Sequence, residues 1–171
     1  LCLCCAFFTS CKEDDGKGYV FGYDISSNPG SLDPQYASDR ESYLIIGSVF
    51  EGLFRIGADG NAEKAMAESY TVSDDGLTYN FKLKQDRYWT DVNGYSKKVT
   101  AADFVFGFRR LFLPETRAPK ESEYFCIKNS DKINSGEITD LSQLGVTAQG
   151  DYSLTIELQY TEPSFAMLLA M

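Results

Sequence analysis

Hydrophobic and polar residues alternate in two separate stretches of the chain, which is the pattern of a β-strand with one buried face. The hydrophobic positions of the first stretch are Leu77, Tyr79, Phe81 and Leu83. Those of the second stretch are Leu154, Ile156, Leu158 and Tyr160. Asp-Gly pairs at 59–60 and 75–76 are typical of tight hairpin turns, so the middle of the chain is predicted to be rich in strands.

Two other stretches repeat hydrophobic residues every three or four positions, as amphipathic helices do. The first helix is predicted to begin near Ser38, because Ser38 and Glu41 have the spacing of a capping box. Its hydrophobic face contains Tyr43, Ile46, Phe50 and Leu53. The second helix is predicted to begin at Thr100, with Asp103 near the positive end of the helix dipole, and to end before Pro114. Its hydrophobic face contains Phe104, Phe108, Leu111 and Phe112.

The order of these elements predicts a mixed α/β fold without regular βαβ alternation. Residues 19–25 alternate well enough to form an opening strand. The length of 171 residues allows one sizeable core. A hydrophobic content of 43% and a charged content of 24% are typical of a globular protein rather than a disordered one.

The charge balance and the absence of histidine exclude several classes of function. The net charge of −9 argues against nucleic-acid binding, because no stripe of Lys and Arg is present to displace counterions from phosphates. Without any His, neither Ser-His-Asp nor Cys-His catalysis can operate within the chain. Residues from Asp91 begin like a calcium loop, but Ser96 stands where the turn requires Gly and the bidentate Glu is missing. The sequence therefore predicts no catalytic site, no metal site and no cofactor.

Four of the five cysteines lie within the first eleven residues. Residues 1–8 are apolar and polar residues begin at Thr9, as at the end of a signal peptide. Cys11 stands where a bacterial lipoprotein carries its acylated Cys, although Phe8 replaces the usual Leu. Residues 1–11 are thus interpreted as a signal-peptide remnant with a lipobox and residues 12–18 as a tether, which predicts a lipoprotein anchored to the outer side of a membrane. A metal cluster is the alternative, but Cys-x-x-Cys spacing and His are absent. Cys126 is expected to be a small buried hydrophobic residue.

Four short motifs in a fixed order carry the most specific signal in the chain. They are Ser-Leu-Asp-Pro at 31–34, Phe-Glu-Gly-Leu at 50–53, Tyr-Trp-Thr-Asp at 88–91 and Thr-Ala-Ala-Asp-Phe-Val at 100–105. Together with Ala-Glu-Ser-Tyr at 67–70 and Thr-Glu-Pro at 161–163, they resemble the N-terminal part of the extracellular solute-binding proteins of peptide-importing ABC transporters. This group is the oligopeptide- and dipeptide-binding family, family 5. The resemblance runs from about Tyr19 to the last residue.

The resemblance implies a two-lobed, type II periplasmic-binding-protein fold, of which this chain is interpreted as an N-terminal fragment. Residues 19–52 would begin the large lobe, residues 53–162 would form an inserted subdomain, and residues 163–171 would return to the large lobe. The implied function is capture of a short peptide between two lobes and its delivery to a membrane permease, with no bond made or broken. In such a fragment Tyr43, Ile46 and Phe50 on the first helix, together with residues 165–171, are expected to be poorly covered.

The resemblance also suggests four residues for ligand contact. It places the stretch before the first helix at the interlobe cleft, where this chain has Ser38, Asp39 and Arg40. Arg40 is suited to pair with a peptide carboxylate, whereas Ser38 fits a helix cap equally well. Lys120 stands where relatives often carry an aromatic residue near the ligand. It either alters the peptide preference or is a solvated surface lysine.

Two rival functions remain open at the level of sequence. A related binding protein for a nickel chelate, haem or an oligosaccharide would share the same motifs. A lipoprotein that keeps this fold but serves only as a scaffold or adhesin is the other possibility. The sequence beyond Met171 would distinguish them.

Overall fold

A four-stranded antiparallel sheet lies at the centre of the computed structural model of this chain, which describes residue 22 and residues 24–170. The strand order is β3-β4-β8-β7, with β3 at Ala67–Val72, β4 at Thr78–Leu83, β7 at Val146–Ala148 and β8 at Ser153–Glu157. The two stretches of alternating hydrophobicity pair directly as β4 and β8, with Phe81 opposite Leu154 and Tyr79 opposite Ile156. The mixed α/β prediction is thereby confirmed.

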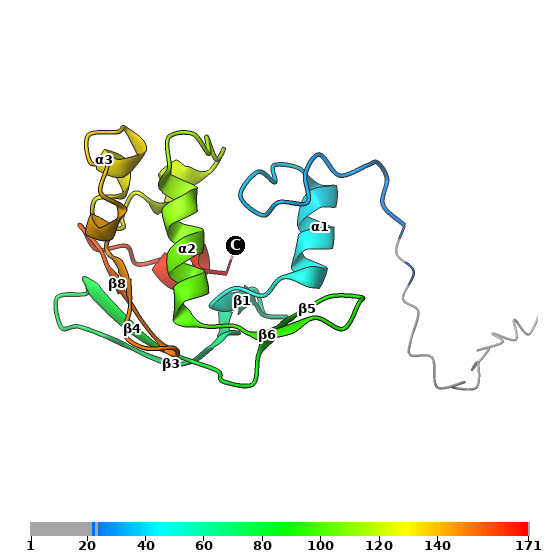
Figure 1. Cartoon of the computed structure of the whole chain (residues 1–171), viewed down its shortest axis with the longest axis horizontal. Helices are drawn as coiled ribbons and strands as arrows, with labels where there is room; N and C mark the ends of the chain where they lie inside the picture. Colours follow the sequence, from blue (N-terminus) through cyan, green and yellow to red (C-terminus); the bar gives the residue numbers. More distant parts are fainter. Residues whose placement is uncertain (1–21, 23, 171) are drawn as a thin grey trace, which may run out of the picture.

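Two small hairpins flank this sheet (Figure 1). One pairs β1 (Phe54–Ile56) with β2 (Ala62–Lys64), and the other pairs β5 (Tyr88–Thr90) with β6 (Ser96–Lys98). The predicted turns are present between β1 and β2 and between β3 and β4. Gly60 and Gly76 adopt φ angles of 80° and 73° there, a region that only glycine enters without strain.

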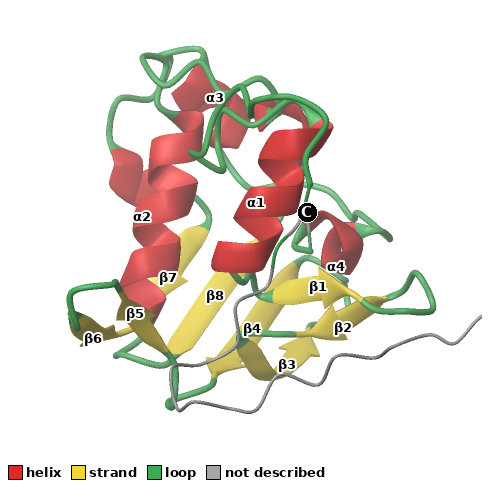
Figure 2. Ribbon diagram, turned by 90° about the vertical axis from the view of Figure 1, so that its right-hand side faces the viewer, coloured by secondary structure: helices red, strands yellow, loops and turns green. Residues whose placement is uncertain are grey.

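The helices lie on one side of the strands (Figure 2). They are α1 (Arg40–Val49), α2 (Ala101–Phe112), α3 (Ser130–Asn134) and α4 (Phe165–Leu168), with short 3₁₀ turns at Glu121–Tyr124 and Leu141–Gln143. The long helix α2 packs on β7 and β8. Helix α1 stands apart from α2, on the side of the β5–β6 hairpin (Figure 1). No helix in the described part of the chain has the length and hydrophobicity needed to cross a bilayer.

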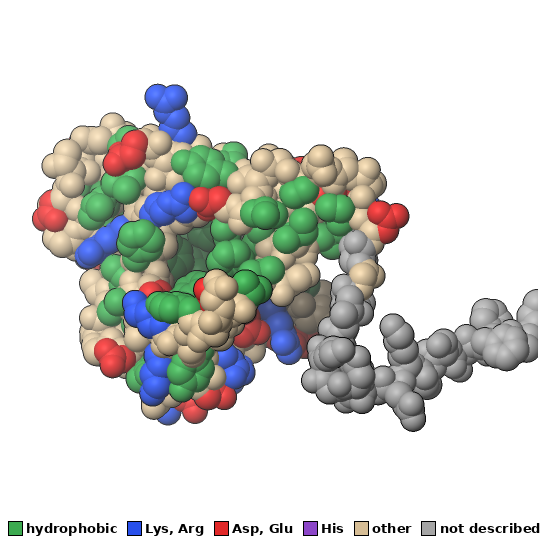
Figure 3. Space-filling model, turned by 45° about the vertical axis from the view of Figure 1, so that its right-hand side comes forward, with side chains coloured by type: hydrophobic (Ala, Val, Ile, Leu, Met, Phe, Trp, Pro, Cys, Tyr) green, Lys and Arg blue, Asp and Glu red, His purple; other side chains and the backbone are tan. Residues whose placement is uncertain are grey.

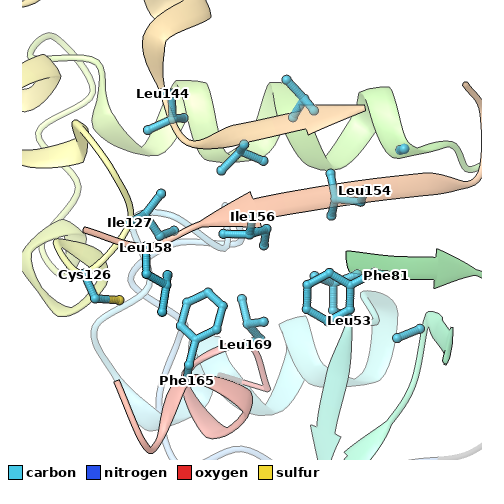
Figure 4. Packing of buried hydrophobic residues seen from close by; sticks show 14 of the residues in the cluster. Leu53, Phe81, Cys126, Ile127, Leu144, Leu154, Ile156, Leu158, Phe165 and Leu169 are labelled. Atoms are coloured by element: carbon cyan, nitrogen blue, oxygen red, sulfur yellow. The ribbon is translucent and has the colours of Figure 1, made fainter. Parts of the chain in front are cut away.

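The hydrophobic core is built from the central sheet, α2 and α4, with further residues from β1, α3 and the connecting segments (Figure 4). Its largest fully buried side chains include Phe112, Phe165, Leu83, Ile127 and Ile156. Cys126 is buried among them, as predicted, and desolvation raises the pKa of its thiol to about 11. The expectation that residues 165–171 are poorly covered is wrong for Phe165 and Leu169. Phe165 is fully buried because its ring packs edge-on against that of Tyr79, with centroids 4.9 Å apart.

Helix α1 differs from its prediction at its first turn. Its N-cap is Asp39 rather than Ser38, because the Asp39 carboxylate accepts from the backbone N of Ser42 at 2.8 Å. Glu41 does not complete a capping box and instead accepts from the Ser26 hydroxyl at 2.7 Å. Tyr43 and Phe50 are exposed, which confirms the expectation for two of the three α1-face residues, whereas Ile46 is half-buried.

Helix α2 begins at its predicted N-cap, Thr100, whose backbone N donates to the Asp103 carboxylate at 2.7 Å. Its buried face contains Ala101, Val105 and Phe112. The predicted Phe104 and Phe108 pack at the edge of the core. The predicted leader, tether and most of the opening strand lie outside the described residues, and Asp24 and Ile25 are not in a strand.

Candidate functional site

The Ser-Leu-Asp-Pro motif forms a turn that is bound to helix α2. Asp33 accepts two hydrogen bonds from the Arg110 guanidinium, Nη1 to Oδ1 at 3.0 Å and Nη2 to Oδ2 at 2.5 Å. Such bidentate charge-assisted pairs are among the stronger and more directional polar contacts in proteins. The hydrogen bonds from Arg110 hold the pKa of the Asp33 carboxyl below its usual range, although partial burial opposes this.

Two further contacts join the same turn to α2. Gln35 Nε2 donates to the backbone carbonyl of Gly107 at 2.7 Å. The Arg110 guanidinium also lies over the Tyr36 ring, 5.6 Å from its centroid, where it is attracted by the negative face of the ring. Residues 33–36 are therefore fixed to α2 by three neighbouring side chains.

The turn leads directly into the predicted ligand-contacting residues. Both carboxylate oxygens of Asp39 are engaged: Oδ1 accepts from Ser42 N, and Oδ2 accepts from the Ser42 hydroxyl at 2.7 Å and from Gly30 N at 3.1 Å. These bonds to Ser42 and Gly30 lower the pKa of Asp39. Asp39 thus holds the start of α1 in place, whereas the side chain of its neighbour Ser38 is exposed.

Arg40 is exposed at the first residue of α1. It lines a shallow depression of about 200 Å³ whose other lining residues are Asp24, Ile25, Ser26, Glu41 and Leu44. No ion pair within 4 Å joins Arg40 to a described carboxylate of residues 24–170. The depression is thus lined by one guanidinium and by the two carboxyl side chains of Asp24 and Glu41.

Lys120 lies against α1 rather than in open solvent. Its ammonium is 4.7 Å from the centroid of the Tyr43 ring, and its interaction with the Tyr43 side chain raises the pKa of Lys120. The Tyr43 hydroxyl donates to the backbone carbonyl of Ala37 at 2.8 Å. The structure thus brings Lys120 close to the segment that carries Ser38, Asp39 and Arg40.

Exposed hydrophobic side chains also lie along α1 and the β5–β6 hairpin. The rings of Phe50 and Trp89 meet edge-on at 6.2 Å, which joins two of the sequence motifs in space. Figure 3 shows hydrophobic side chains around a hollow on this face of the molecule. Large hydrophobic surfaces of this kind are typical of a binding surface or of contact with another part of a protein.

The residues that sequence reasoning missed are those that hold the site together. Arg110, Gln35 and Ser42 were not singled out, because each acts through a partner that local patterns do not reveal. The sequence contains the adjacent pair Arg109-Arg110, but nothing in it indicates which of the two contacts Asp33.

Comparison with known proteins identifies the family. The family model for bacterial extracellular solute-binding proteins, family 5, middle part, matches residues 61–171. The chain belongs to this family. The dipeptide-binding protein of Lactococcus lactis is 36% identical over 159 residues, covering 93% of this chain and 28% of that protein. The probable deoxycholate-binding periplasmic protein YgiS of Escherichia coli is 34% identical, covering 88% of this chain and 28% of that protein.

Solved structures agree with this assignment. OppA of Listeria monocytogenes bound to peptide superposes with a TM-score of 0.79 at 32% identity, over 85% of this chain and 28% of that chain. The substrate-binding domain of an oligopeptide ABC transporter from Bacillus anthracis superposes with a TM-score of 0.76 at 40% identity, over 82% and 26%. The chain therefore has the fold of the N-terminal portion of these two-lobed proteins and spans little more than a quarter of their length.

Proposed function

We propose that the full-length protein is the substrate-binding component of an ABC importer, which captures extracellular dipeptides or oligopeptides and delivers them to a membrane permease. The observation that carries this proposal is membership of family 5, with relatives that are named for peptide binding. The protein would act by binding alone, because the closure of two lobes around a bound peptide requires no covalent chemistry. Main-chain hydrogen bonds to an extended peptide would supply affinity, and roomy pockets would allow a broad range of side chains.

The proposal assigns residues 19–52 and 163–171 to the large lobe and residues 53–162 to a subdomain. The first boundary of this division is supported by the core, whose buried residues begin at Leu53, whereas Phe165 and Leu169 of the returning segment pack into that same core. A hydrogen bond of 3.3 Å from Phe54 N to the Leu169 carbonyl oxygen also supports this division. This bond joins the two places where the chain would pass between the large lobe and the subdomain. In the mature protein, Cys11 would carry the lipid anchor, because it follows an apolar leader and precedes a polar tether. Two or more acyl chains on it would make membrane attachment stable.

At the site, we propose that Arg40 and Lys120 meet the negative groups of the ligand and that Ser38 offers a hydroxyl. Asp39 would contribute chiefly by fixing the start of α1, since both of its oxygens are already engaged there. Arg40 is the better candidate for a bidentate pair with a carboxylate, because a guanidinium matches that geometry and an ammonium does not.

Calorimetry on the ligand-free, full-length protein tests this proposal. A mixture of short peptides should bind without being hydrolysed, and Arg40→Ala should weaken binding by roughly 1–3 kcal/mol. Arg55→Ala is a matched control, because Arg55 is another exposed arginine and pairs with Glu63 on a distant hairpin. Loss of affinity in both variants, or in neither, would contradict the role given to Arg40.

A bile acid is a second candidate ligand, favoured by the relationship to the probable deoxycholate-binding protein. Deoxycholate combines a carboxylate, which Arg40 would meet, with a rigid apolar body, which the exposed side chains of Tyr43 and Phe50 would meet. Calorimetry also decides between peptides and a bile acid. If deoxycholate binds and peptides do not, the bile acid replaces the peptide as the proposed ligand. Binding of Ni²⁺ or haem alone would do the same, and the absence of any small ligand would favour a scaffold or adhesin.

A further inference from the structure

A continuous set of hydrogen bonds joins helix α2 to the first turn of helix α1. Arg110 donates to the Asp33 carboxylate, and Asp33 N donates to the Ser31 hydroxyl at 3.1 Å. Ser31 N then donates to the Ser42 hydroxyl at 3.1 Å, and that hydroxyl donates to Asp39 at 2.7 Å. The set therefore begins at a helix of the core and ends at the residue before Arg40.

The Arg110–Asp33 pair has the least exposed side chains of the ion pairs in the described part of the chain. Its two side chains are each 33% exposed, whereas those of the Arg55–Glu63 pair are 62% and 49% exposed. A partly desolvated bidentate pair is screened less by water and salt than an exposed one. Ser42, in the middle of the set, is fully buried, so losing its partners would leave a polar group unsatisfied.

Asp33 also determines the path of the backbone toward α1. Its backbone carbonyl accepts from Tyr36 N at 3.0 Å and Ala37 N at 3.2 Å, and its Oδ1 accepts from Gln35 N at 3.1 Å. One residue therefore binds α2 through its side chain and closes the turn that leads to Ser38. A change in the position of Asp33 must move the segment that follows it.

We propose that Arg110 is a positioning residue for ligand binding: through Asp33, Ser31 and Ser42 it holds Arg40 in the orientation that meets the ligand. This inference rests on the proposed function of the site and adds that a residue outside the ligand contacts controls affinity. Without the Arg110 contact, the binding-competent arrangement of residues 33–40 is only fractionally populated, and the apparent affinity falls by that fraction.

The test uses the full-length protein and the variants Arg110→Met, Arg110→Lys and Arg55→Met, at a temperature where circular dichroism shows all of them folded. Arg110→Met should weaken peptide binding about tenfold, because a charge-assisted bond is lost and the segment loosens. Arg110→Lys should recover part of that loss, and Arg55→Met should have no effect. Amide exchange at residues 33–42 should accelerate in Arg110→Met while that of β4 and β8 is unchanged.

A double-mutant cycle separates positioning from general destabilisation. If Arg110 acts through Arg40, Arg110→Met should cost little affinity once Arg40 has been replaced by Ala. An unchanged affinity in Arg110→Met, or a full tenfold loss in the Arg40→Ala background, would overturn the inference. Neither result would contradict the proposed function of peptide binding. A wild-type protein that binds no peptide would instead remove the proposed function, and this inference with it.

Discussion

The N-terminal segment, residues 24–50, and the remainder of the described chain are stabilised in different ways. The hydrophobic core takes all its members from Leu53 to Leu169, and within residues 24–50 only Ala37 and Ser42 are buried. The segment is joined to the rest by an ion pair, one amide hydrogen bond and ring contacts. Hydrophobic burial is cooperative over a whole core, whereas such polar contacts act locally. The segment with the candidate ligand residues is thus the one that local changes can move.

Removal of a core side chain should give the largest effect. Phe165→Ala in the full-length protein should lower the free energy of unfolding by roughly 3–5 kcal/mol, because it deletes a fully buried ring and leaves a cavity. Urea unfolding followed by circular dichroism measures the change. Phe106→Ala is the matched control, since Phe106 is 68% exposed on α2 and should change stability by less than about 0.5 kcal/mol. Equal losses in the two variants would mean that α4 does not belong to the core.

Replacing the two helix caps should show the difference between the regions directly. Thr100→Ala should cost roughly 0.5–2 kcal/mol of global stability, because α2 is part of the core and loses a hydrogen bond at its start. Asp39→Ala removes the cap of α1 and should leave the global unfolding transition almost unchanged. It should instead accelerate amide exchange at the first turn of α1, near Ser42. A global loss in Asp39→Ala as large as that in Thr100→Ala would show that the segment and the core unfold as one unit.

The same division explains which features the sequence predicts well. The strands β4 and β8 and the start of α2 follow from alternation, turn residues and a cap, all of which are local patterns. The sequence predicts Ser38 as the cap of α1 because Ser38 and Glu41 have capping-box spacing, although Asp39 is an equally good N-cap residue. The choice between them depends on Gly30 and Ser42, whose positions are set by tertiary contacts.

Two other features depend on contacts between distant parts of the chain. Residues 165–171 are expected to be poorly covered because the resemblance implies that part of the large lobe is missing, and no local pattern indicates that Phe165 packs on Tyr79. Asp33 and Arg110 are 77 positions apart, so their pairing could not be inferred from spacing. The family resemblance gave the fold, but it did not identify the residues that hold the candidate ligand segment in place.

Acidification should give the smallest effect and should act on the segment first. The pKa values of Asp33 and Asp39 are both lowered in the folded protein, Asp33 chiefly by Arg110 and Asp39 chiefly by Ser42. A carboxyl group with a lowered pKa binds protons less readily in the folded state than in the unfolded state. Its stabilising contribution is therefore present above the ordinary pKa of 3.8 and is lost as the pH falls through the lower folded value.

Between pH 6 and pH 3, amide protection of residues 33–42 should thus fall relative to that of β4 and β8, after correction for the intrinsic pH dependence of exchange. Asp33→Asn is the matched variant, because it keeps the size of the side chain but cannot ionise. In this variant the amides of residues 33–42 should already be less protected at pH 6, because Arg110 no longer faces a carboxylate. Their protection should also fall less on acidification. A pH response identical to that of the wild-type protein would show that Asp33 does not contribute to it, and that the segment is held chiefly by Asp39 and the aromatic contacts of Tyr36 and Tyr43.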